Sequence, residues 1–330
     1  MRIAINGMGR IGRLLFRRLV HHPEIELVAV NDIMSADNLA YLLTYDSVYG
    51  TFEEEIGIAE GSFIVHNKKI AVLKTENPAE LPWKAMNIAV VIECTGKFTT
   101  ADTAGLHIKA GAGKVLLSTT GSADIPLMIY GFNQNCLTAE TKIISPGGCM
   151  TNCSVHILNL LNSIGIVSAQ LNILHSYTSR QELVDAANKN FRRGRAAAES
   201  IIPVEIDLHQ SLERLMPGLQ NKIAAVSTRV PVANGAMADF TIQLTKTCSA
   251  GEINKLLKNA SQNEYKHVLG YTEEPIVSTD IKGNTHSGIV DASLTSVVGN
   301  QVKLIVWFDN EYGFTSRMID WLLYWKKMKK

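Results

Sequence analysis

The stretch RIAINGMGRIGRLLF, residues 2–16, decides the fold. Its first residues, RIAIN, form an apolar run typical of a strand that is buried on both faces. Gly7, Gly9 and Gly12 follow in a GxGxxG pattern, and residues 10–22 then carry apolar side chains on one broad helical face. A strand, a glycine-rich turn and a helix in this order predict the first βα unit of a doubly wound parallel sheet.

The spacing of the glycines points to a phosphate-binding turn. Gly7 permits the tight turn, Gly9 lets the backbone approach a pyrophosphate, and Gly12 lets the helix pack closely against the strand. The helix N-terminus then presents unpaired N–H groups to the phosphates. Arg10 and Ile11 lie in the same turn, and Arg10 is either a further phosphate contact or half of a surface salt bridge. A merely tight βα turn would show the same glycines, so the interpretation needs support from elsewhere.

The next strand supplies that support. The run ELVAVND ends at Asp32, twenty residues after Gly12. A carboxylate at this position can accept a hydrogen bond from a ribose 2′-hydroxyl, whereas it would repel a 2′-phosphate. The sequence therefore predicts a dinucleotide cofactor, and NAD rather than NADP.

Composition narrows the class of protein. A chain of 330 residues is long enough for two domains, and 46% hydrophobic with 19% charged residues is ordinary for a globular protein. The net charge of +1 argues against nucleic acid as the main partner. No apolar run is long enough for a membrane span, and the N-terminus does not resemble a signal peptide. Five scattered cysteines suit a reducing compartment, so we expect a cytoplasmic protein without membrane partners.

The pattern of apolar residues along the sequence changes near residue 150. Before it, short apolar runs alternate with helical stretches, which predicts a parallel, doubly wound sheet. The predicted strands there are residues 2–5, 26–30, 88–92, 114–117 and 142–144. After it, longer alternating runs predict an α+β domain with a largely antiparallel sheet. These runs are residues 168–177, 222–231, 238–246 and 301–308, and a helical pattern from residue 311 ends in the basic sequence WKKMKK.

The stretch ISPGGCMTNCSVHIL, residues 144–158, carries Cys149 and Cys153. A zinc site is disfavoured because there is no second CxxC pair and His156 lies in an apolar helical run. A disulfide within one helical turn has poor geometry. The remaining interpretations are a nucleophile and a buried spectator. The pattern predicts a helix with Cys149 in its first turn, where the helix N-terminus lowers the pKa of a thiol, and we predict no metal site in the chain.

A thiolate nucleophile also needs a base. His175 closes the predicted strand within SAQLNILHSYTS, at the kind of position that lines active sites, although a lone histidine there is often structural. Cysteine, histidine and NAD together suit the covalent oxidation of an aldehyde through a thiohemiacetal.

Many ordered motifs now show a resemblance. They are AINGMGRIGR, ECTGKFT, CMTNC, HSYTSRQELVD, RRGRAAAESIIP, STRVPVAN, GYTEEPIVSTD, NTHSGIVDA and WFDNEYGFTSRMIDW. From end to end the chain resembles the glyceraldehyde-3-phosphate dehydrogenase family, and IIPV, YGFNQ and LIVWFDNEYGFTSRM also resemble its erythrose-4-phosphate dehydrogenase branch. The resemblance implies an NAD-binding Rossmann domain at 1–148, a catalytic domain at 149–309 and a C-terminal helix at 310–330 that packs back on the first domain.

The resemblance also implies roles for individual residues. Cys149 would attack the aldehyde and His175 would take the hydroxyl proton, while the backbone N–H of Cys149 and His175 would stabilise the oxyanion. The implied cofactor-binding residues are Gly7, Gly9, Arg10, Ile11, Gly12, Asn31, Asp32, Thr95, Ser118, Asn310 and Tyr312. For Thr95 and Ser118, turn capping and sheet-end hydrogen bonding are the alternatives.

The family binds the substrate phosphate and the attacking phosphate at two anion sites. Thr178, Arg180 and Arg229 match the first, although Arg180 replaces a threonine and can instead be solvated. Thr151 and Arg193 match the second, acyl-acceptor site.

The second anion site departs from the family pattern. Gly148 and Met150 replace a serine and a threonine, and Ile206 and Asp207 replace a threonine and a glycine. Losing three hydroxyl donors to a charged ligand, at about 1.5–3 kcal/mol each, would weaken phosphate binding strongly. We expect water to compete as acyl acceptor; the alternative is a divergent loop that still supports phosphorolysis.

The expected activity is NAD-dependent oxidation of glyceraldehyde 3-phosphate or erythrose 4-phosphate. The family resemblance further implies a homotetramer in which the loop at about 176–200 reaches toward a neighbour's cofactor site. A second hypothesis is an NAD-binding regulatory protein of the same fold with weak or no dehydrogenase activity.

Overall fold

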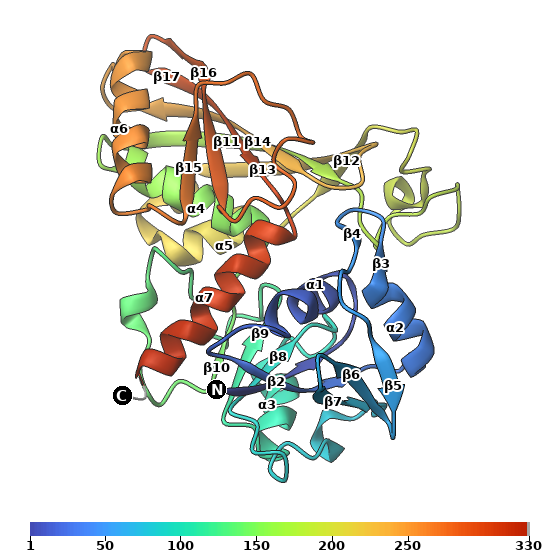
Figure 1. Cartoon of the computed structure of the whole chain (residues 1–330). Coiled ribbons are helices and arrows are strands. Elements are labelled where there is room, and N and C mark those ends of the chain that lie inside the picture. The colour runs from blue at the N-terminus through green and yellow to red at the C-terminus, as the bar shows by residue number, and fades with distance from the viewer. Residues whose placement is uncertain (329–330) are drawn as a thin grey trace. The chain divides into compact units, whose positions relative to one another are not determined.

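The computed structural model describes residues 1–328; the last two lysines of WKKMKK, and with them the end of the predicted helix 310–330, lie outside the described residues. The chain forms two compact units (Figure 1). Unit 1 contains residues 1–148 and the chain from Arg317 onward, and unit 2 contains residues 149–316.

Unit 1 is built on one sheet of eight strands in the order β10-β9-β8-β1-β2-β7-β6-β5. The strands are β1 (Arg2–Asn6), β2 (Glu26–Asn31), β5 (Gly57–Ala59), β6 (Ser62–Val65), β7 (Lys68–Leu73), β8 (Val90–Glu93), β9 (Lys114–Leu117) and β10 (Ile143–Ile144). Pairing is parallel from β10 to β7, which confirms the predicted doubly wound sheet. Strands β5, β6 and β7 were not predicted from the sequence; β7 continues the parallel sheet, and β6 and β5 extend it beyond β7 in antiparallel fashion.

Helices connect the strands of unit 1. They are α1 (Arg10–Leu19), α2 (Ala36–Thr44) and α3 (Ala101–Lys109), with short 3-10 turns at Pro78–Glu80 and Gln134–Cys136. A small two-stranded sheet, β3 (Tyr45–Asp46) and β4 (Gly50–Thr51), follows α2. α1 ends three residues before the predicted residue 22. Ser35 caps α2 and Thr100 forms a capping box on α3, so side-chain oxygens satisfy the first N–H groups of both helices.

The last helix, α7 (Tyr312–Met328), begins at Tyr312 because the Oδ1 atom of Asp309 accepts the N–H groups of Glu311 and Tyr312. The boundary between the units falls inside this helix, at Arg317, rather than at residue 310. Within unit 1, Trp321 and Trp325 are almost completely buried. The 317–328 segment is therefore part of the core of unit 1.

Unit 2 contains a sheet of seven strands in the order β12-β13-β11-β14-β17-β16-β15. The strands are β11 (Ile166–Ser176), β12 (Ile202–Glu205), β13 (Ile223–Val230), β14 (Ala236–Leu244), β15 (Leu269–Thr272), β16 (Gly288–Val298) and β17 (Gln301–Phe308). All neighbours are antiparallel except β11 with β13 and β15 with β16, so the largely antiparallel prediction is confirmed.

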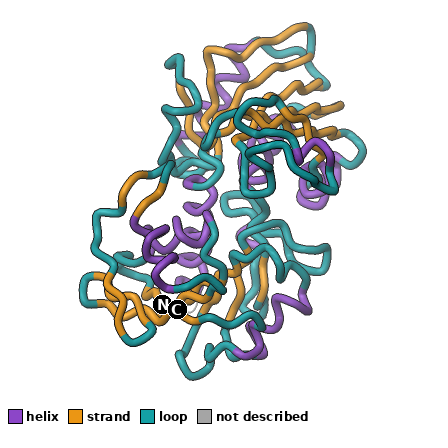
Figure 2. Tube along the Cα trace, turned by 90° about the vertical axis from the view of Figure 1, so that its right-hand side faces the viewer, coloured by secondary structure: helices purple, strands orange, loops and turns teal. Residues whose placement is uncertain are grey.

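Three helices pack on the sheet of unit 2, namely α4 (Cys149–Asn162), α5 (Leu208–Leu215) and α6 (Ala250–Gln262). Two further 3-10 turns lie at Phe191–Gly194 and Pro217–Leu219. Figure 2 shows how the strands lie side by side within each unit, with the helices against them. Within residues 1–328, no helix combines the length and hydropathy needed to cross a membrane.

The glycine turn between β1 and α1 has the geometry that its spacing predicted. Gly7 has a φ of +93°, and a Cβ there would lie 2.6 Å from the backbone N of Thr95. Gly9, by contrast, has no atom within 4 Å of an added Cβ, so its backbone is open to a ligand. A Cβ on Gly12 would lie 2.1 Å from the carbonyl oxygen of Gly7. Close backbone contacts therefore require glycine at positions 7 and 12, whereas only Gly9 of the three faces open space.

Gly12→Ala should lower the free energy of unfolding by about 1–3 kcal/mol, because backbone rather than a flexible side chain opposes the new methyl group. Chemical denaturation measures the change. Gly105→Ala is the matched control, since Gly105 lies in α3 with nothing within 4 Å of an added Cβ and should gain helix stability. Equal effects of the two substitutions would contradict the steric account.

Candidate active site

Cys149 is the first residue of α4, and the buried face of this helix fixes its position. Its Sγ atom lies 3.6 Å from Nε2 of His175, the second-last residue of β11. The structure thus brings together the predicted nucleophile and base. Cys153, one turn deeper, is completely buried, and all five cysteines are free thiols.

The ring of His175 is held in one tautomer. Its Nδ1 atom lies 2.7 Å from the carbonyl oxygen of Ser176, and because a carbonyl only accepts, Nδ1 carries the hydrogen. The same carbonyl accepts a bond from Nη1 of Arg229. In the neutral ring, Nε2 therefore presents its lone pair toward the sulfur of Cys149. The backbone N–H of His175 belongs to β11, which is paired on both sides, so the ring is the part of His175 that faces the thiol.

The expectation of a lowered net pKa for Cys149 is wrong, although the backbone at the helix N-terminus acts in the predicted direction. Burial raises the pKa of Cys149 to about 11, although Arg229 and the backbone N–H groups of Met150 and Cys149 act in the opposite direction. Burial, and then the charge of Arg229, lower the pKa of His175 to about 3. Each group alone thus favours its neutral form. A thiolate becomes accessible when the proton moves from Sγ to Nε2, because the two opposite charges then stabilise each other across 3.6 Å.

Asn310 is oriented by two donors. Its Oδ1 atom accepts a hydrogen bond from Oγ of Ser176 at 3.2 Å and one from the N–H of Gly235 at 3.0 Å. These donors fix the amide so that Nδ2 faces away from them, and no acceptor for Nδ2 occurs among residues 1–328. Ser176 and Gly235 were not predicted as site residues, since nothing in the motif HSYTS distinguishes a serine that orients an amide two strands away.

Arg229 lies near the thiol, and Arg193 and Arg180 lie near Arg229. Arg229 is 7% exposed and pairs in register with His175 across β11 and β13. Burial lowers the pKa of Arg229, Cys149 acts in the opposite direction, and the charges of Arg193 and Arg180 lower it further, so both of these cations are close enough to act on Arg229. Among the described residues, none of them forms a salt bridge with a carboxylate, and Nε of Arg229 is buried without a hydrogen-bond partner. The cluster has the chemistry of an anion site.

The other predicted anion-site residues lie on the same unit. Thr178 accepts a hydrogen bond from the backbone N–H of Arg180, which shapes the loop after β11. Thr151 is 3% exposed in the first turn of α4. An added Cβ on Gly148 would meet no atom within 4 Å, so the space for a serine side chain is open. Asp207 is exposed at the start of α5 and makes no capping hydrogen bond there.

In unit 1, Asp32 lies beside the glycine turn. Its Oδ2 atom accepts the N–H of Met8 at 2.6 Å and its Oδ1 atom accepts the N–H of Met34 at 3.0 Å, which fixes the carboxylate at the end of β2. Asn31 is buried and donates both amide hydrogens, to Asn6 and to the carbonyl of Thr75. Asn31 therefore holds the strand ends together.

The remaining predicted cofactor residues have internal partners. Arg10 forms an ion pair with Asp46 at 2.5 Å, the salt-bridge alternative for this residue. Thr95 donates its hydroxyl to Glu93 and accepts the N–H of Lys97, which is turn capping. Ser118 hydrogen-bonds the thiol of Cys94. Ile11 is half-buried in α1, and Tyr312 is half-buried at the start of α7.

Glu93 was not predicted as a site residue, and it connects several side chains at the carboxyl ends of β1 and β8. It is 2% exposed and accepts hydrogen bonds from Asn6, His107 and Thr95. Trp83 donates to Nδ1 of His107, so Nε2 of that ring carries the hydrogen that bonds Glu93. The network ties the ends of β1 and β8 to the loop that holds Thr95.

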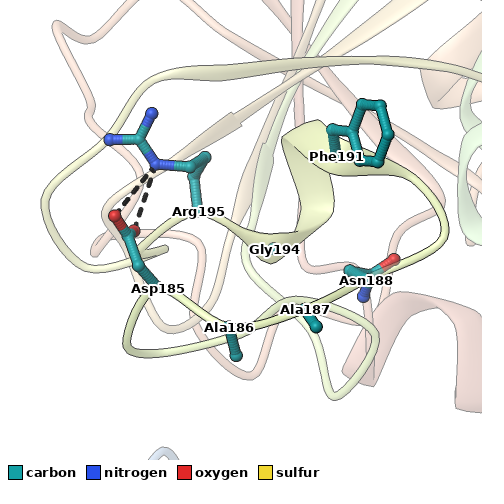
Figure 3. Close-up of a pocket in the computed structure, with 7 residues that line it drawn as sticks. All are labelled: Asp185, Ala186, Ala187, Asn188, Phe191, Gly194 and Arg195. Carbon is teal, nitrogen blue, oxygen red and sulfur yellow. Dashed lines mark hydrogen bonds and ion pairs between the residues drawn. The ribbon is translucent and has the colours of Figure 1, made fainter.

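The loop between β11 and β12 lines an open hollow of about 470 Å³. Figure 3 shows Asp185 and Arg195 paired on one side of it and Phe191 on the other. Neither Cys149 nor His175 lines this hollow, so it is separate from the reactive pair.

Comparison with known proteins identifies the family. A model of the glyceraldehyde 3-phosphate dehydrogenase NAD binding domain matches residues 1–101, and a model of the C-terminal domain matches residues 148–310. Glyceraldehyde-3-phosphate dehydrogenase 2 of Bacillus subtilis is 38% identical over 323 residues, 97% of this chain and 95% of the relative. Glyceraldehyde-3-phosphate dehydrogenase of Pseudomonas aeruginosa is 40% identical over 324 residues, 97% of this chain and 96% of the relative. The corresponding protein of Podospora anserina is 39% identical over 328 residues, 98% of this chain and 97% of the relative.

Two matched domains and full-length relatives agree with the glycine turn, the carboxylate of Asp32 beside it and the Cys149–His175 pair. The chain belongs to the glyceraldehyde-3-phosphate dehydrogenase family and is an NAD-dependent oxidoreductase of that type.

Proposed function

We propose that the chain oxidises a phosphorylated aldehyde, glyceraldehyde 3-phosphate or erythrose 4-phosphate, through a thioester on Cys149. The observation that carries this proposal is the 3.6 Å contact between Sγ of Cys149 and Nε2 of His175, with the tautomer fixed by Ser176. The names of the relatives support glyceraldehyde 3-phosphate as substrate. The NAD-binding regulatory alternative would leave this geometry without a use.

The residues of the chain move the protons of the reaction. As Sγ of Cys149 bonds to the carbonyl carbon, Nε2 of His175 takes the thiol proton, and the backbone N–H of Cys149 and the ring of His175 stabilise the oxyanion. His175 returns its proton to this oxygen, which gives the thiohemiacetal hydroxyl. When bound, NAD supplies the hydride acceptor. His175 then takes the hydroxyl proton as the hydride leaves, and the product on Cys149 is a thioester.

Binding groups hold the substrate and cofactor in this arrangement. We assign the substrate phosphate to Arg229, Arg180 and Thr178, because an unpaired guanidinium cluster favours a dianion through charge-assisted hydrogen bonds. Asn310 is proposed to donate from Nδ2 to the nicotinamide amide, with its Oδ1 held by Ser176. In unit 1, Asp32 is proposed to accept the ribose hydroxyl.

The acyl acceptor is proposed to be water in competition with inorganic phosphate. Of the second anion site, Arg193 and Thr151 are retained in the sequence, but Gly148, Met150 and Ile206 bring no hydroxyl. Thr151 is almost completely buried, which leaves Arg193 as the main side chain for a second anion. A weakly held phosphate leaves the thioester open to hydrolysis.

The chain is proposed to assemble as a homotetramer through the loop after β11. Four large apolar side chains in and next to this loop are exposed, namely Leu183 (62%), Val184 (77%), Phe191 (89%) and Ile201 (73%). Apolar groups gathered in this way are typical of an interface. The five free thiols support the proposed cytoplasmic location.

His175→Asn should lower kcat by about 10²–10⁴-fold, because the thiol then lacks its general base. In the variant, the alkylation rate of Cys149 with iodoacetamide should rise only at a pH above about 8.5, the ordinary pKa of a thiol. The reason is that burial raises the pKa of Cys149 and no imidazole takes its proton. The parent should alkylate much faster at pH 7. NAD binding, measured by calorimetry, should be unchanged, and equal pH profiles for parent and variant would contradict the role of His175.

Product analysis by NMR tests the acyl acceptor, with each aldehyde in the presence and absence of inorganic phosphate. The parent should form the acid in both conditions. Gly148→Ser combined with Met150→Thr should lower the KM for phosphate at least about tenfold, because it restores two hydroxyl donors on either side of Cys149. Gly218→Ser is the control, since its Cβ also meets no atom within 4 Å but lies in the Pro217–Leu219 turn. An acyl phosphate as the sole product of the parent would contradict the proposal.

A further inference from the structure

We propose that His21, Glu54 and His66 form a binding site for a divalent transition metal of the zinc type. The three residues belong to unit 1, whereas Cys149 and His175 belong to unit 2, so the site is separate from the catalytic pair. One ligand atom of each residue lies within 4.8 Å of the other two. The inference does not depend on the dehydrogenase proposal.

The three ligands come from three different elements. His21 lies just after the end of α1, and Glu54 lies in the segment that follows β4. His66 is the first of the two residues that connect β6 to β7. Because the fold alone brings residues 21, 54 and 66 together, no spacing in the sequence could reveal the group.

The distances are close to those that a bound metal requires. Oε2 of Glu54 lies 2.6 Å from Nε2 of His66, and Oε1 of Glu54 lies 3.2 Å from Nε2 of His21. The two imidazole rings meet edge to face with centroids 5.1 Å apart. A tetrahedral zinc ion with bonds of about 2.0–2.1 Å separates its ligand atoms by about 3.3 Å. Small side-chain shifts therefore convert the hydrogen-bonded group into a coordination site.

The donor set selects the class of metal. Two imidazoles with one carboxylate form a known zinc donor set that leaves further positions to water, and imidazole suits zinc, copper and nickel better than magnesium or calcium. The side chains of His21, Glu54 and His66 are 40%, 26% and 63% exposed. An ion can thus enter directly from solvent.

The backbone at His66 gives an independent observation. His66 has a φ of +45° and the next residue, Asn67, has a φ of +62°. A two-residue hairpin with both φ values positive is the type I′ turn, for which Asn-Gly is the preferred sequence. Histidine is less preferred than asparagine in the first of these positions, and here its Nε2 atom lies 2.6 Å from Oε2 of Glu54. Strained positions of this kind are typical of functional sites.

A metal bound here would link the β6–β7 hairpin to α1, the helix that follows Gly7 and Gly9 of the glycine turn. Arg17 of α1 already donates to the carbonyls of Leu43, Thr44 and Gly50, and its guanidinium lies over the ring of Phe52. The segment that carries Glu54 is therefore already tied to α1. Coordination by His66 would add the β6–β7 hairpin to this assembly, and so we expect metal to stabilise unit 1.

The test compares metal binding by the full chain and by His66→Asn. Asparagine suits the turn better than histidine, so this variant should fold at least as stably without metal but lose the ligand. After chelator treatment, equilibrium dialysis with Zn²⁺ should show one bound equivalent more for the parent than for His66→Asn. Glu54→Gln should bind this equivalent at least about tenfold more weakly. His22→Asn is the control, because His22 accepts the N–H of Glu24 and lies outside the group.

Two further measurements distinguish this site from the thiols. Co²⁺ should give ligand-field bands without thiolate-to-cobalt charge transfer for the equivalent that His66→Asn loses. Zn²⁺ should also raise the Tm of the parent and of His22→Asn more than that of His66→Asn. Equal stoichiometry for parent and His66→Asn, or a thiolate spectrum for the equivalent in question, would overturn the proposal.

Discussion

The catalytic interpretation depends on one hydrogen bond, from Nδ1 of His175 to the carbonyl oxygen of Ser176. It decides which ring nitrogen carries the hydrogen, and so it leaves Nε2 as an acceptor 3.6 Å from the sulfur of Cys149. A ring in the other tautomer would point an N–H group at a neutral thiol and could not take its proton. The acceptor is a backbone atom at the end of a strand paired on both sides, so the sheet itself holds the tautomer.

The same strand end organises the groups around the thiol. Arg229 faces His175 in register and donates to the carbonyl of Ser176, while the hydroxyl of Ser176 orients Asn310. Base, cation and amide therefore take their positions from two consecutive residues of β11. Because α4 is buried along most of its length, Cys149 is held against this strand end by packing.

Sequence patterns predicted the parts of the structure that short-range sterics and periodicity determine. Gly7, Gly9 and Gly12 have distinct steric environments that agree with their predicted roles, and the central strands of unit 1 were visible as apolar runs. Strands β5, β6 and β7 were not predicted, although β6 (SFIV) and β7 (KKIAVL) contain short apolar runs; β5 is an edge strand of only three residues.

Properties that depend on distant groups were not predictable from local sequence. The pKa of Cys149 is one example, since burial outweighs the helix N-terminus that a local pattern suggests. The hydrogen bonding of Asn31 is another example, because its side-chain amide donates to Asn6 and to the carbonyl oxygen of Thr75, which are far away in the sequence. His21, Glu54 and His66 likewise acquire a common neighbourhood only through the fold.

Arg229 acts on the reactive pair in a way that reconciles its proposed role in substrate binding with proton transfer. Its charge lowers the pKa of Cys149 and also lowers the pKa of His175. The first effect favours the thiolate and the second opposes the imidazolium, so the two effects oppose each other in the transfer of a proton from Sγ to Nε2. A phosphate dianion that neutralises Arg229 weakens both effects together. The cation can therefore serve the proposed substrate-phosphate site without strongly favouring either charge state of the pair, so a guanidinium can lie beside the proposed base.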